Sequence, residues 1–364
     1  MWRATGRLKS ASDMIALAEG LVGRFRECVE GLAGPLGARR LALAVSGGPD
    51  SMAMLALAAA AFPGQVAAAT VDHRLRAASA GEAAMVADWC AGAGVPHTIL
   101  GVAQPRDARD NLHDWARRER YRLLEHWAIE VGAHLLATAH HADDQAETFL
   151  MRAARGSGVA GLAGIRARQV VEVSKIVSEA SLMMNVWSLD LIRPLLGWRR
   201  HELLSIAVEH AIPFVDDPSN ADGRFDRTQF RAMLATTPLL DPAQLARAAD
   251  HVAEADAALR AMERWLWSTC KVAPTGVDDP DFQVWLDLGD LPRELKRRLA
   301  RAAISNVRDV NGITRPDFTE ASNVEPLLDA VEAGKVATQA GILAAPDGSI
   351  WRFSAAPPRR FPAQ

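Results

Sequence analysis

Cysteine is scarce in this chain, and long apolar runs are missing. The three cysteines, Cys28, Cys90 and Cys270, lie far apart and form no CxxC pair. This spacing argues against a disulfide framework and against a zinc or iron–sulfur site, and it is typical of proteins in a reducing cytoplasm. No apolar run reaches the roughly 18 residues that a membrane-spanning helix needs. The sequence therefore predicts a cytoplasmic protein that does not cross a membrane.

An excess of positive charge is also absent, because the formal net charge of the 364 residues is −3 at pH 7. No overall field draws such a protein toward nucleic acid, so any surface that binds RNA must be a local basic patch. The composition, with 49% hydrophobic and 23% charged residues, is that of an ordinary globular protein. The length allows two or three domains.

The stretch 41-LALAVSGGPDSMAML-55 places a loop, SGGPDS at 46–51, between an apolar strand and a helical pattern. The loop lacks the lysine of GxxxxGK[ST] and is not GxGxxG. Its glycines let backbone N–H groups approach an anion, and the helix start adds positive potential. Ser46 and Ser51 can donate hydrogen bonds to phosphate, whereas Asp50 can hold a Mg²⁺ that neutralises it. The alternative is a plain turn with a capping Ser or Asp.

Strand-like and helix-like segments alternate along the first 160 residues. The strand-like segments are 41–45, 65–71, 96–100 and 134–139, and the helix-like segments are 51–61, 81–92, 111–131 and 143–154. This alternation predicts an α/β fold, a doubly wound and mostly parallel sheet with helices on both faces. Polar motifs follow three of the strands, after Val45, Val71 and Ala139. Because ligands bind at the carboxyl ends of such strands, we expect one shared cleft there.

The rest of the chain predicts smaller modules. The N-terminal residues favour an amphipathic helix over a transit peptide, because Asp13 and Glu19 interrupt the basic pattern. Further strands are expected at 169–192, 337–343 and 350–353, with a hairpin signal at Asp347-Gly348, and further helices at 198–210, 243–267, 290–305 and 324–333. The expected domains are an N-terminal helical extension at 1–35, a catalytic domain at 36–235, a helical linker module at 236–275 and a small α+β region at 276–364.

A second polar stretch, 138-TAHHADDQAETFLMRAARGSG-158, opens one of the predicted helices. His140, Asp144 and Glu147 are spaced i, i+4 and i+7, so they share one helix face. Several ionisable groups on one face are costly as packing, which favours a functional site. The alternative is that the carboxylates only interact with the helix dipole and that the histidines form a solvated cap.

These motifs resemble those of a known family. The complete SGGPDS loop is similar to that of the PP-loop (N-type) ATP pyrophosphatases, which have an adenine nucleotide alpha hydrolase-like fold. Over roughly residues 35–235 the chain resembles tRNA(Ile)-lysidine synthetase, and the C-terminal third resembles a reduced form of that family's tRNA-binding appendage. The matching motifs, in chain order, are SGGPDS at 46–51, VDHRLR at 71–76, NLHDWARRERY at 111–121, AHHADDQAET at 139–148, RGSG at 155–158, RPLL at 193–196 and DDPSN at 216–220.

The resemblance implies a ligase that uses ATP and Mg²⁺ to join L-lysine to C2 of the wobble cytidine in a tRNA(Ile) with a CAU anticodon. Cytosine O2 attacks the α-phosphorus of ATP and pyrophosphate leaves. The lysine ε-amine then displaces AMP from the adenylated cytidine, giving lysidine. Members of the family often form homodimers, so a homodimer is a possible assembly of this chain.

The resemblance also implies roles for individual residues. The expected ATP-binding residues are Ser46, Gly47, Gly48, Pro49, Asp50, Ser51, Asp72 and His73, with Asp50 also the Mg²⁺ ligand. The expected catalytic residues are Asp50, Arg117, His140, Asp144 and Glu147, of which Arg117 would stabilise the transferring phosphoryl group and a carboxylate would act as the general base toward lysine. The expected tRNA-binding residues are Arg155, Arg193, Arg199, Arg227 and Arg231. The run 227-RTQFR-231 departs from the family's RNRIR form, which leaves the phosphate contact expected at Gln229 open.

Other enzymes and a binding module are the alternatives. Another PP-loop tRNA-modifying enzyme would share the loop, but thiolating members need cysteines at useful spacing and amidating members need an amidotransferase domain. A catalytically silent module that binds tRNA or nucleotide would not need Asp50, Asp144 and Glu147, all of which are present.

Overall fold

The protein is described here by a computed structural model that covers residues 17–74, 79–103, 111–178, 183–215, 226–273, 283–319 and 322–357. The last two residues of the VDHRLR motif and the whole DDPSN motif lie outside these residues. The chain divides into two units, Met1–Ala253 and Glu254–Gln364, and helix α9 (Pro242–Thr269) contributes to both. The boundaries of the four domains expected from the sequence stay predictions.

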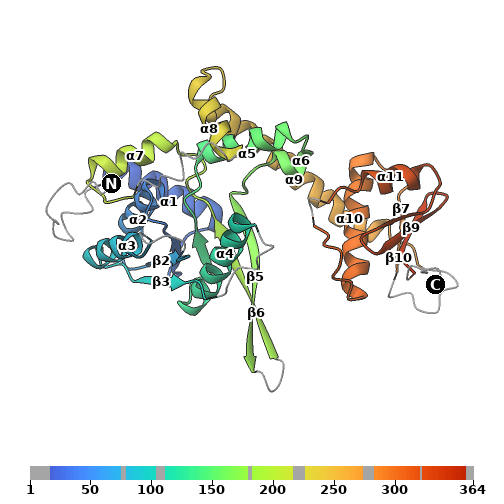
Figure 1. The fold of residues 1–364 in the computed structure, drawn as a ribbon, viewed down its shortest axis with the longest axis horizontal. Coiled ribbons are helices and arrows are strands. Elements are labelled where there is room, and N and C mark those ends of the chain that lie inside the picture. Colours follow the sequence, from blue (N-terminus) through green and yellow to red (C-terminus); the bar gives the residue numbers. More distant parts are fainter. Residues whose placement is uncertain are drawn as a thin grey trace. The chain divides into compact units, whose positions relative to one another are not determined.

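Six strands form the sheet of the first unit, in the order β3-β2-β1-β4-β6-β5 (Figure 1). They are β1 (Leu41–Ala44), β2 (Val66–Asp72), β3 (His97–Gly101), β4 (Leu135–Ala137), β5 (Arg168–Ser178) and β6 (Met183–Ile192). Neighbouring strands are parallel except β5 and β6, which form an antiparallel hairpin that projects from the sheet. The predicted mostly parallel sheet is confirmed.

Helices cover both faces of this sheet, because alternate strand residues pack into two different cores. Leu41 and Leu43 join one core with buried residues of four helices, and Ala42 between them joins another with α4. The helices of the first core are α1 (Glu19–Ala33), α2 (Pro49–Ala61), α3 (Ser79–Ala93) and α7 (Arg200–Glu209), and α4 spans Leu112–Glu130. Since side chains alternate along a strand, an apolar run that is buried on both sides is what a doubly wound sheet requires. The predicted fold class is confirmed.

Strand β1 is the point at which the chain changes direction across the sheet. It pairs with β2 on one side and with β4 on the other. In open sheets of this type, ligands bind beyond the carboxyl ends of the two strands at such a switch point. Helix α2 follows β1, and α5 (Ala142–Ala154) follows β4. The short helix α6 (Val159–Leu162) comes next, and α8 (Asp226–Thr236) packs against α5.

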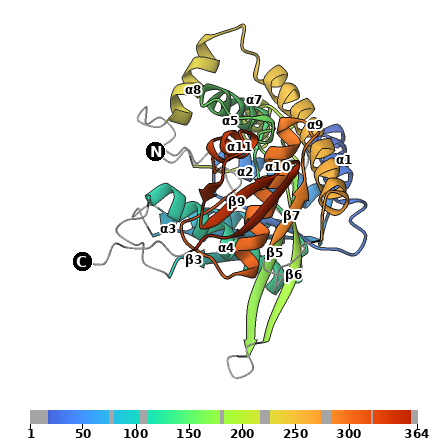
Figure 2. The same cartoon turned by 90° about the vertical axis from the view of Figure 1, so that its right-hand side faces the viewer.

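The second unit is an antiparallel sheet with helices, as expected for its α+β class (Figure 2). Its strands run in the order β7-β10-β9-β8. They are β7 (Val284–Asp287), β8 (Ala337–Gln339), β9 (Ile342–Asp347) and β10 (Ile350–Ala355), and the helices are α10 (Arg293–Val310) and α11 (Glu325–Glu332). Leu286, Leu299 and Phe353 are among the buried residues of its own core.

Two details of this unit differ from expectation. The single strand expected at 337–343 is wrong, because the segment is a hairpin of β8 and β9. Ala340 and Gly341 at its turn have φ values of 51° and 81°, the conformation that a two-residue hairpin turn needs. Strand β7 was not predicted, since four residues, three of them buried, show no alternation. The hairpin at Asp347-Gly348 is confirmed.

Candidate active site

The loop after β1 is closed by its own two serines. Ser51 Oγ donates to the carbonyl of Gly48 at 3.0 Å and accepts from the N–H of Ser46 at 3.2 Å. Gly47 has a φ of 86°, a left-handed conformation that favours glycine. Pro49 begins α2, so the first-turn N–H groups of the helix, which have no acceptor within it, lie at the loop. The loop thus has the form of an anion cradle.

Asp50 supplies the acidic group of this loop. Its Oδ2 lies 3.5 Å from His141 Nε2, whereas its Oδ1 is buried without a hydrogen-bond partner. Because a buried carboxylate oxygen without a partner is costly, the position suits a bound cation. Among the described residues no group of three or more His, Cys, Asp or Glu could hold a metal by itself. A Mg²⁺ at Asp50 would therefore complete its shell with phosphate oxygens and water, which is its usual arrangement.

His141 is the N-cap of helix α5, and it lies between Asp50 of the loop after β1 and Asp144 of α5. The N–H of Asp144 donates to His141 Nδ1 at 3.3 Å, and Asp144 Oδ2 accepts from the His141 N–H at 3.1 Å, which is a reciprocal capping box. The imidazole is buried, with 2% exposure, and its Nε2 lies 3.5 Å from both Asp50 Oδ2 and Asp144 Oδ2. Burial lowers the pKa of His141, but the hydrogen bond and charges of these carboxylates outweigh burial and raise it overall.

His141 was not among the residues predicted for the site, whereas its neighbour His140 was. The i, i+4, i+7 spacing drew attention to His140, but the expectation that it shares a helix face with Asp144 and Glu147 is wrong, because α5 begins only at Ala142. The sequence did contain a signal for His141. This residue lies three positions before Asp144, which is the spacing of the N-cap and N3 residues in a reciprocal capping box.

Two of the carboxylates of α5, those of Asp144 and Glu147, are held by two arginines of α8. Arg227 donates to Asp144 Oδ1 and to Glu147 Oε2, both at 2.7 Å, and Arg231 donates to Glu147 Oε1 at 2.7 Å. Burial raises the pKa of Asp144, but the charges of His141 and Arg227 outweigh burial and lower it overall. From the sequence, the two carboxylates were expected to bind the substrate lysine, and the two arginines were expected to bind the tRNA. The structure brings all four together.

His140 lies beside this cluster. Its Nδ1 is 2.9 Å from Thr138 Oγ1. Burial, together with the positive charges of Arg193, Arg227 and Arg117, lowers the pKa of His140 to about 3, against the opposing charge of Asp144. The imidazole is therefore neutral at pH 7, and it can exchange hydrogen bonds with a substrate without adding charge to the site.

The remaining arginines of the predicted site differ in exposure. Arg117 is exposed, and its guanidinium lies 5.0 Å from the ring centre of Tyr121, the only tyrosine in the sequence. Arg155 is exposed at the C-terminal end of α5. Arg193 is only 5% exposed and donates to the carbonyl of Arg166 at 2.6 Å. An arginine in that position has little surface to offer to a phosphate.

Arg199 also has acidic partners inside the protein. It donates to Asp143 Oδ2 at 3.2 Å and to Asp241 Oδ1 at 3.1 Å, and the N–H of Arg200 donates to the same Asp143 oxygen at 2.8 Å. These bonds tie the first turn of α5 to the start of α7 and to the segment before α9. Arg199 therefore has a structural role here, and its contact with tRNA stays a prediction.

Asp72 ends β2, which neighbours β1 in the sheet, and His73 follows it. Asp72 accepts from Ser79 Oγ at 2.7 Å and from the N–H of Arg74 at 2.8 Å, and the Ser79 bond is the main cause of its lowered pKa. The ring of His73 lies 6.4 Å from that of Trp115, and its Nδ1 is buried without a partner. The sheet order puts both residues at the edge where the loop after β1 lies.

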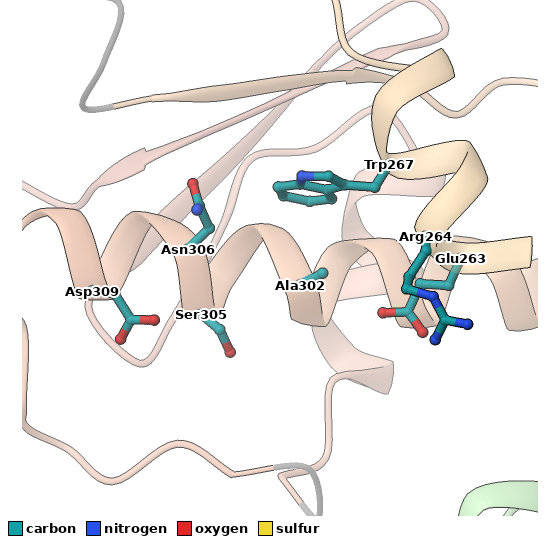
Figure 3. Close-up of a pocket in the computed structure, with 7 residues that line it drawn as sticks. All are labelled: Glu263, Arg264, Trp267, Ala302, Ser305, Asn306 and Asp309. Carbon is teal, nitrogen blue, oxygen red and sulfur yellow. The ribbon is translucent and has the colours of Figure 1, made fainter. Parts of the chain in front are cut away.

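A hollow of about 410 Å³ lies in the second unit, between α9 and α10 (Figure 3). Figure 3 shows the indole of Trp267 reaching from α9 across α10 toward Asn306. The other lining residues are Glu263, Arg264, Ala302, Ser305 and Asp309. None of the residues predicted to act in catalysis or binding lines this hollow. None of the described helices is long and apolar enough to span a membrane.

Comparisons with known proteins agree with these features. Residues 22–237 match the PP-loop domain family. The chain is 40% identical over 342 residues to tRNA(Ile)-lysidine synthase from Novosphingobium aromaticivorans, covering 94% of this chain and 95% of the relative. It is 39% identical over 338 residues to the enzyme of the same name from Zymomonas mobilis, covering 92% and 94%.

A solved structure, the U34-tRNA thiolase NcsA from Methanococcus maripaludis, is more remote. It is 16% identical, has a TM-score of 0.49, and the match covers 65% of this chain and 80% of that one. Family membership thus rests on the sequence matches, which span most of the chain and both loops of the candidate site. By these matches, the chain belongs to the tRNA(Ile)-lysidine synthase family of PP-loop proteins.

Proposed function

We propose that the chain ligates L-lysine to C2 of the wobble cytidine in a tRNA(Ile) with a CAU anticodon, through an adenylated cytidine, and releases AMP and pyrophosphate. One observation carries the proposal. Asp50 of the SGGPDS loop and Asp144 of α5 each have a carboxylate oxygen 3.5 Å from the same atom, Nε2 of His141. A loop suited to ATP and carboxylates suited to a cationic amino acid therefore share one site. The names of the relatives support the same reaction.

In the first step the protein has to position ATP and the cytosine in line and neutralise charge. The backbone of 46–51 would bind the pyrophosphate portion, and Asp50 would hold Mg²⁺, which when bound neutralises the phosphates. Arg117 is exposed and can approach the transferring phosphoryl group, where a cation stabilises developing charge. Neutral His140 can accept or donate a hydrogen bond there.

In the second step the protein has to bind lysine and free its ε-amine of a proton. Lysine carries ammonium groups and a carboxylate, and the side chains of α5 and α8 offer groups of opposite charge to both. Asp144 and Glu147 match an ammonium group, whereas Arg227 and Arg231 match a carboxylate in the bidentate manner of arginine. One carboxylate would take the proton as general base, since only the neutral amine attacks C2. Arg227 and Arg231 are therefore assigned to the lysine pocket in preference to the tRNA.

The free thiols argue against sulfur transfer as the alternative reaction. Cys90 is buried, and burial raises its pKa to about 12, so a nucleophilic thiolate does not form there at pH 7. Cys28 lies in α1, and Cys270 follows α9 in the second unit. None of the three is among the residues that meet at the switch point between β1 and β4.

The direct test is incorporation of labelled lysine into RNA. Purified protein, ATP and Mg²⁺ are incubated with a tRNA(Ile) that has a CAU anticodon, and a parallel reaction holds the same tRNA with its wobble C changed to U. We expect label in the first reaction only. Absence of label in both, with ATP still cleaved to AMP and pyrophosphate, would overturn lysine as the nucleophile and keep the ATP site. Absence of ATP cleavage by the folded protein would favour the silent module.

A salt titration separates the exposed and buried arginines. Arg155→Ala is expected to weaken tRNA binding and to flatten the dependence of log K on log salt by about one phosphate contact. Arg193→Ala is expected to leave this slope unchanged, because the guanidinium is buried and occupied by the Arg166 carbonyl. Measurement of tRNA affinity at several salt concentrations checks both. A flattened slope for Arg193→Ala would return that residue to the RNA surface.

A further inference from the structure

His141 is the buried group that links the two halves of the site. It belongs neither to the SGGPDS loop nor to the carboxylate pair of α5. Its Nε2 is 3.5 Å from Asp50 Oδ2 and 3.5 Å from Asp144 Oδ2, and its Nδ1 lies at the start of α5. The chain thus places one rigid ring between the residue proposed to hold Mg²⁺ and a residue proposed to hold lysine.

We infer that His141 is a positioning residue that holds Asp50 and Asp144 in one fixed arrangement, so that the adenylation half and the lysine half of the site are aligned together. This inference rests on the function proposed above. His141 itself touches neither reacting atom in this assignment. It acts through the two carboxylates.

The orientation of the ring follows from its hydrogen bonds. Nδ1 accepts from the N–H of Asp144, so in the neutral ring the proton lies on Nε2. That nitrogen faces the two carboxylate oxygens, and it can donate to either of them. Asp50 is thereby held through Oδ2, which leaves its unpartnered Oδ1 for a cation. Groups that orient a ligand carboxylate in this way typically change metal affinity or activity by 10–100-fold when they are removed.

The ring is also well fixed in space. It is 2% exposed, and the carboxylate of Asp143, 3.8 Å from Nδ1, is itself held by Arg199 and by the N–H of Arg200. Asp143, the third acidic neighbour of the ring, is therefore held on the Nδ1 side and does not compete for Nε2. The capping function and the bridging function use different nitrogens of one ring, so they can be separated by substitution.

Two variants separate them. His141→Asn retains an acceptor near the position of Nδ1, and asparagine is a good helix cap, but its amide is too short to reach the carboxylates from the position of Nε2. His141→Gln retains a donor near the position of Nε2 and loses the cap. His126→Asn is the control for loss of an imidazole, since His126 lies on α4 with its Nδ1 2.7 Å from the carbonyl of Arg122.

The assays are pyrophosphate release against Mg²⁺ concentration, lysine incorporation against lysine concentration, and thermal unfolding. We expect His141→Asn to melt close to the wild type, yet to need about 10-fold or more Mg²⁺ and lysine for half-maximal rates. His141→Gln should melt lower and keep rates nearer the wild type at temperatures where it is folded. His126→Asn should keep wild-type requirements.

The opposite pattern would overturn the inference. If His141→Asn has wild-type Mg²⁺ and lysine requirements while His141→Gln loses both stability and rate, the residue is only a helix cap. A change in one requirement alone would also contradict a shared alignment. These outcomes need an active wild type, so they cannot be confused with failure of the proposed function, which shows as absence of labelled RNA with the wild-type protein.

Discussion

Asp50→Asn is expected to abolish ATP cleavage while tRNA affinity stays nearly unchanged. The substitution keeps the shape of the side chain but removes the charge of a carboxylate whose Oδ1 is buried without a partner. A neutral amide binds Mg²⁺ poorly, so charge on the transferring phosphoryl group would no longer be neutralised. We expect pyrophosphate release to fall by about 10²-fold or more, the scale on which loss of one electrostatic contact in a transition state acts. Pyrophosphate release and tRNA binding are measured on the same preparation.

Asp143→Asn is the matched control for this prediction. Its carboxylate is as sheltered as that of Asp50, with side-chain exposures of 20% and 26%, but it is occupied by Arg199 and by the N–H of Arg200. We expect that variant to lose stability and to keep ATP cleavage when folded. Equal loss of ATP cleavage in both variants would mean that Asp50 has no special role. Loss of tRNA binding by Asp50→Asn would contradict a role confined to the nucleotide.

Glu147→Gln is expected to stop lysine transfer more strongly than ATP cleavage. The Glu147 side chain is 2% exposed, and both of its oxygens accept from guanidinium groups of Arg227 and Arg231. The amide keeps the shape but offers one acceptor oxygen and turns an N–H₂ group toward a cation. We expect lysine incorporation to fall by about 10²-fold. Breaking a fully buried pair costs roughly 3–5 kcal/mol, and the partly exposed arginines should reduce this to about 1–3 kcal/mol of unfolding free energy.

Glu202→Gln is the control for that loss of charge. Glu202 also accepts from an arginine, Arg24, at 2.8 Å and closes the cap of α7, but it lies outside the cluster on α5. Its variant should lose some stability and keep lysine transfer. Single-turnover pyrophosphate release, labelled lysine incorporation and thermal unfolding are compared for the two variants. Normal lysine transfer by Glu147→Gln would show that Glu147 only anchors α8.

Sequence patterns did not indicate internal partners that are distant in the chain. Arg227 and Arg231 were expected at the tRNA because basic residues after a loop resemble a phosphate-binding run. Their partners lie some 80 residues earlier, on α5, and no local pattern indicates this pairing. Arg193 and Arg199 were also expected at the tRNA, and this contact stays a prediction, although the structure gives both residues internal acceptors.

The sequence by itself determined the fold class and the edge of the sheet at which the candidate site lies. Short apolar runs at 41–45, 65–71 and 134–139 have to be buried on both faces, and this requirement specifies a parallel sheet between helices. Polar loops after such strands have to lie at one edge of that sheet. The place of the glycines and acidic residues of those loops therefore follows from the sequence alone.

Only the tertiary structure decided which groups meet. The strand order places β1 between β2 and β4, and that adjacency brings Asp50 to His141 and Asp144 over a separation of about 90 residues. The packing of α8 on α5 decided that Arg227 and Arg231 donate hydrogen bonds to the carboxylates of α5. The physical reason is that helix and strand periodicity depend on near neighbours in the chain. Hydrogen bonds and ion pairs act over about 3 Å in space, and only the folded backbone sets those distances.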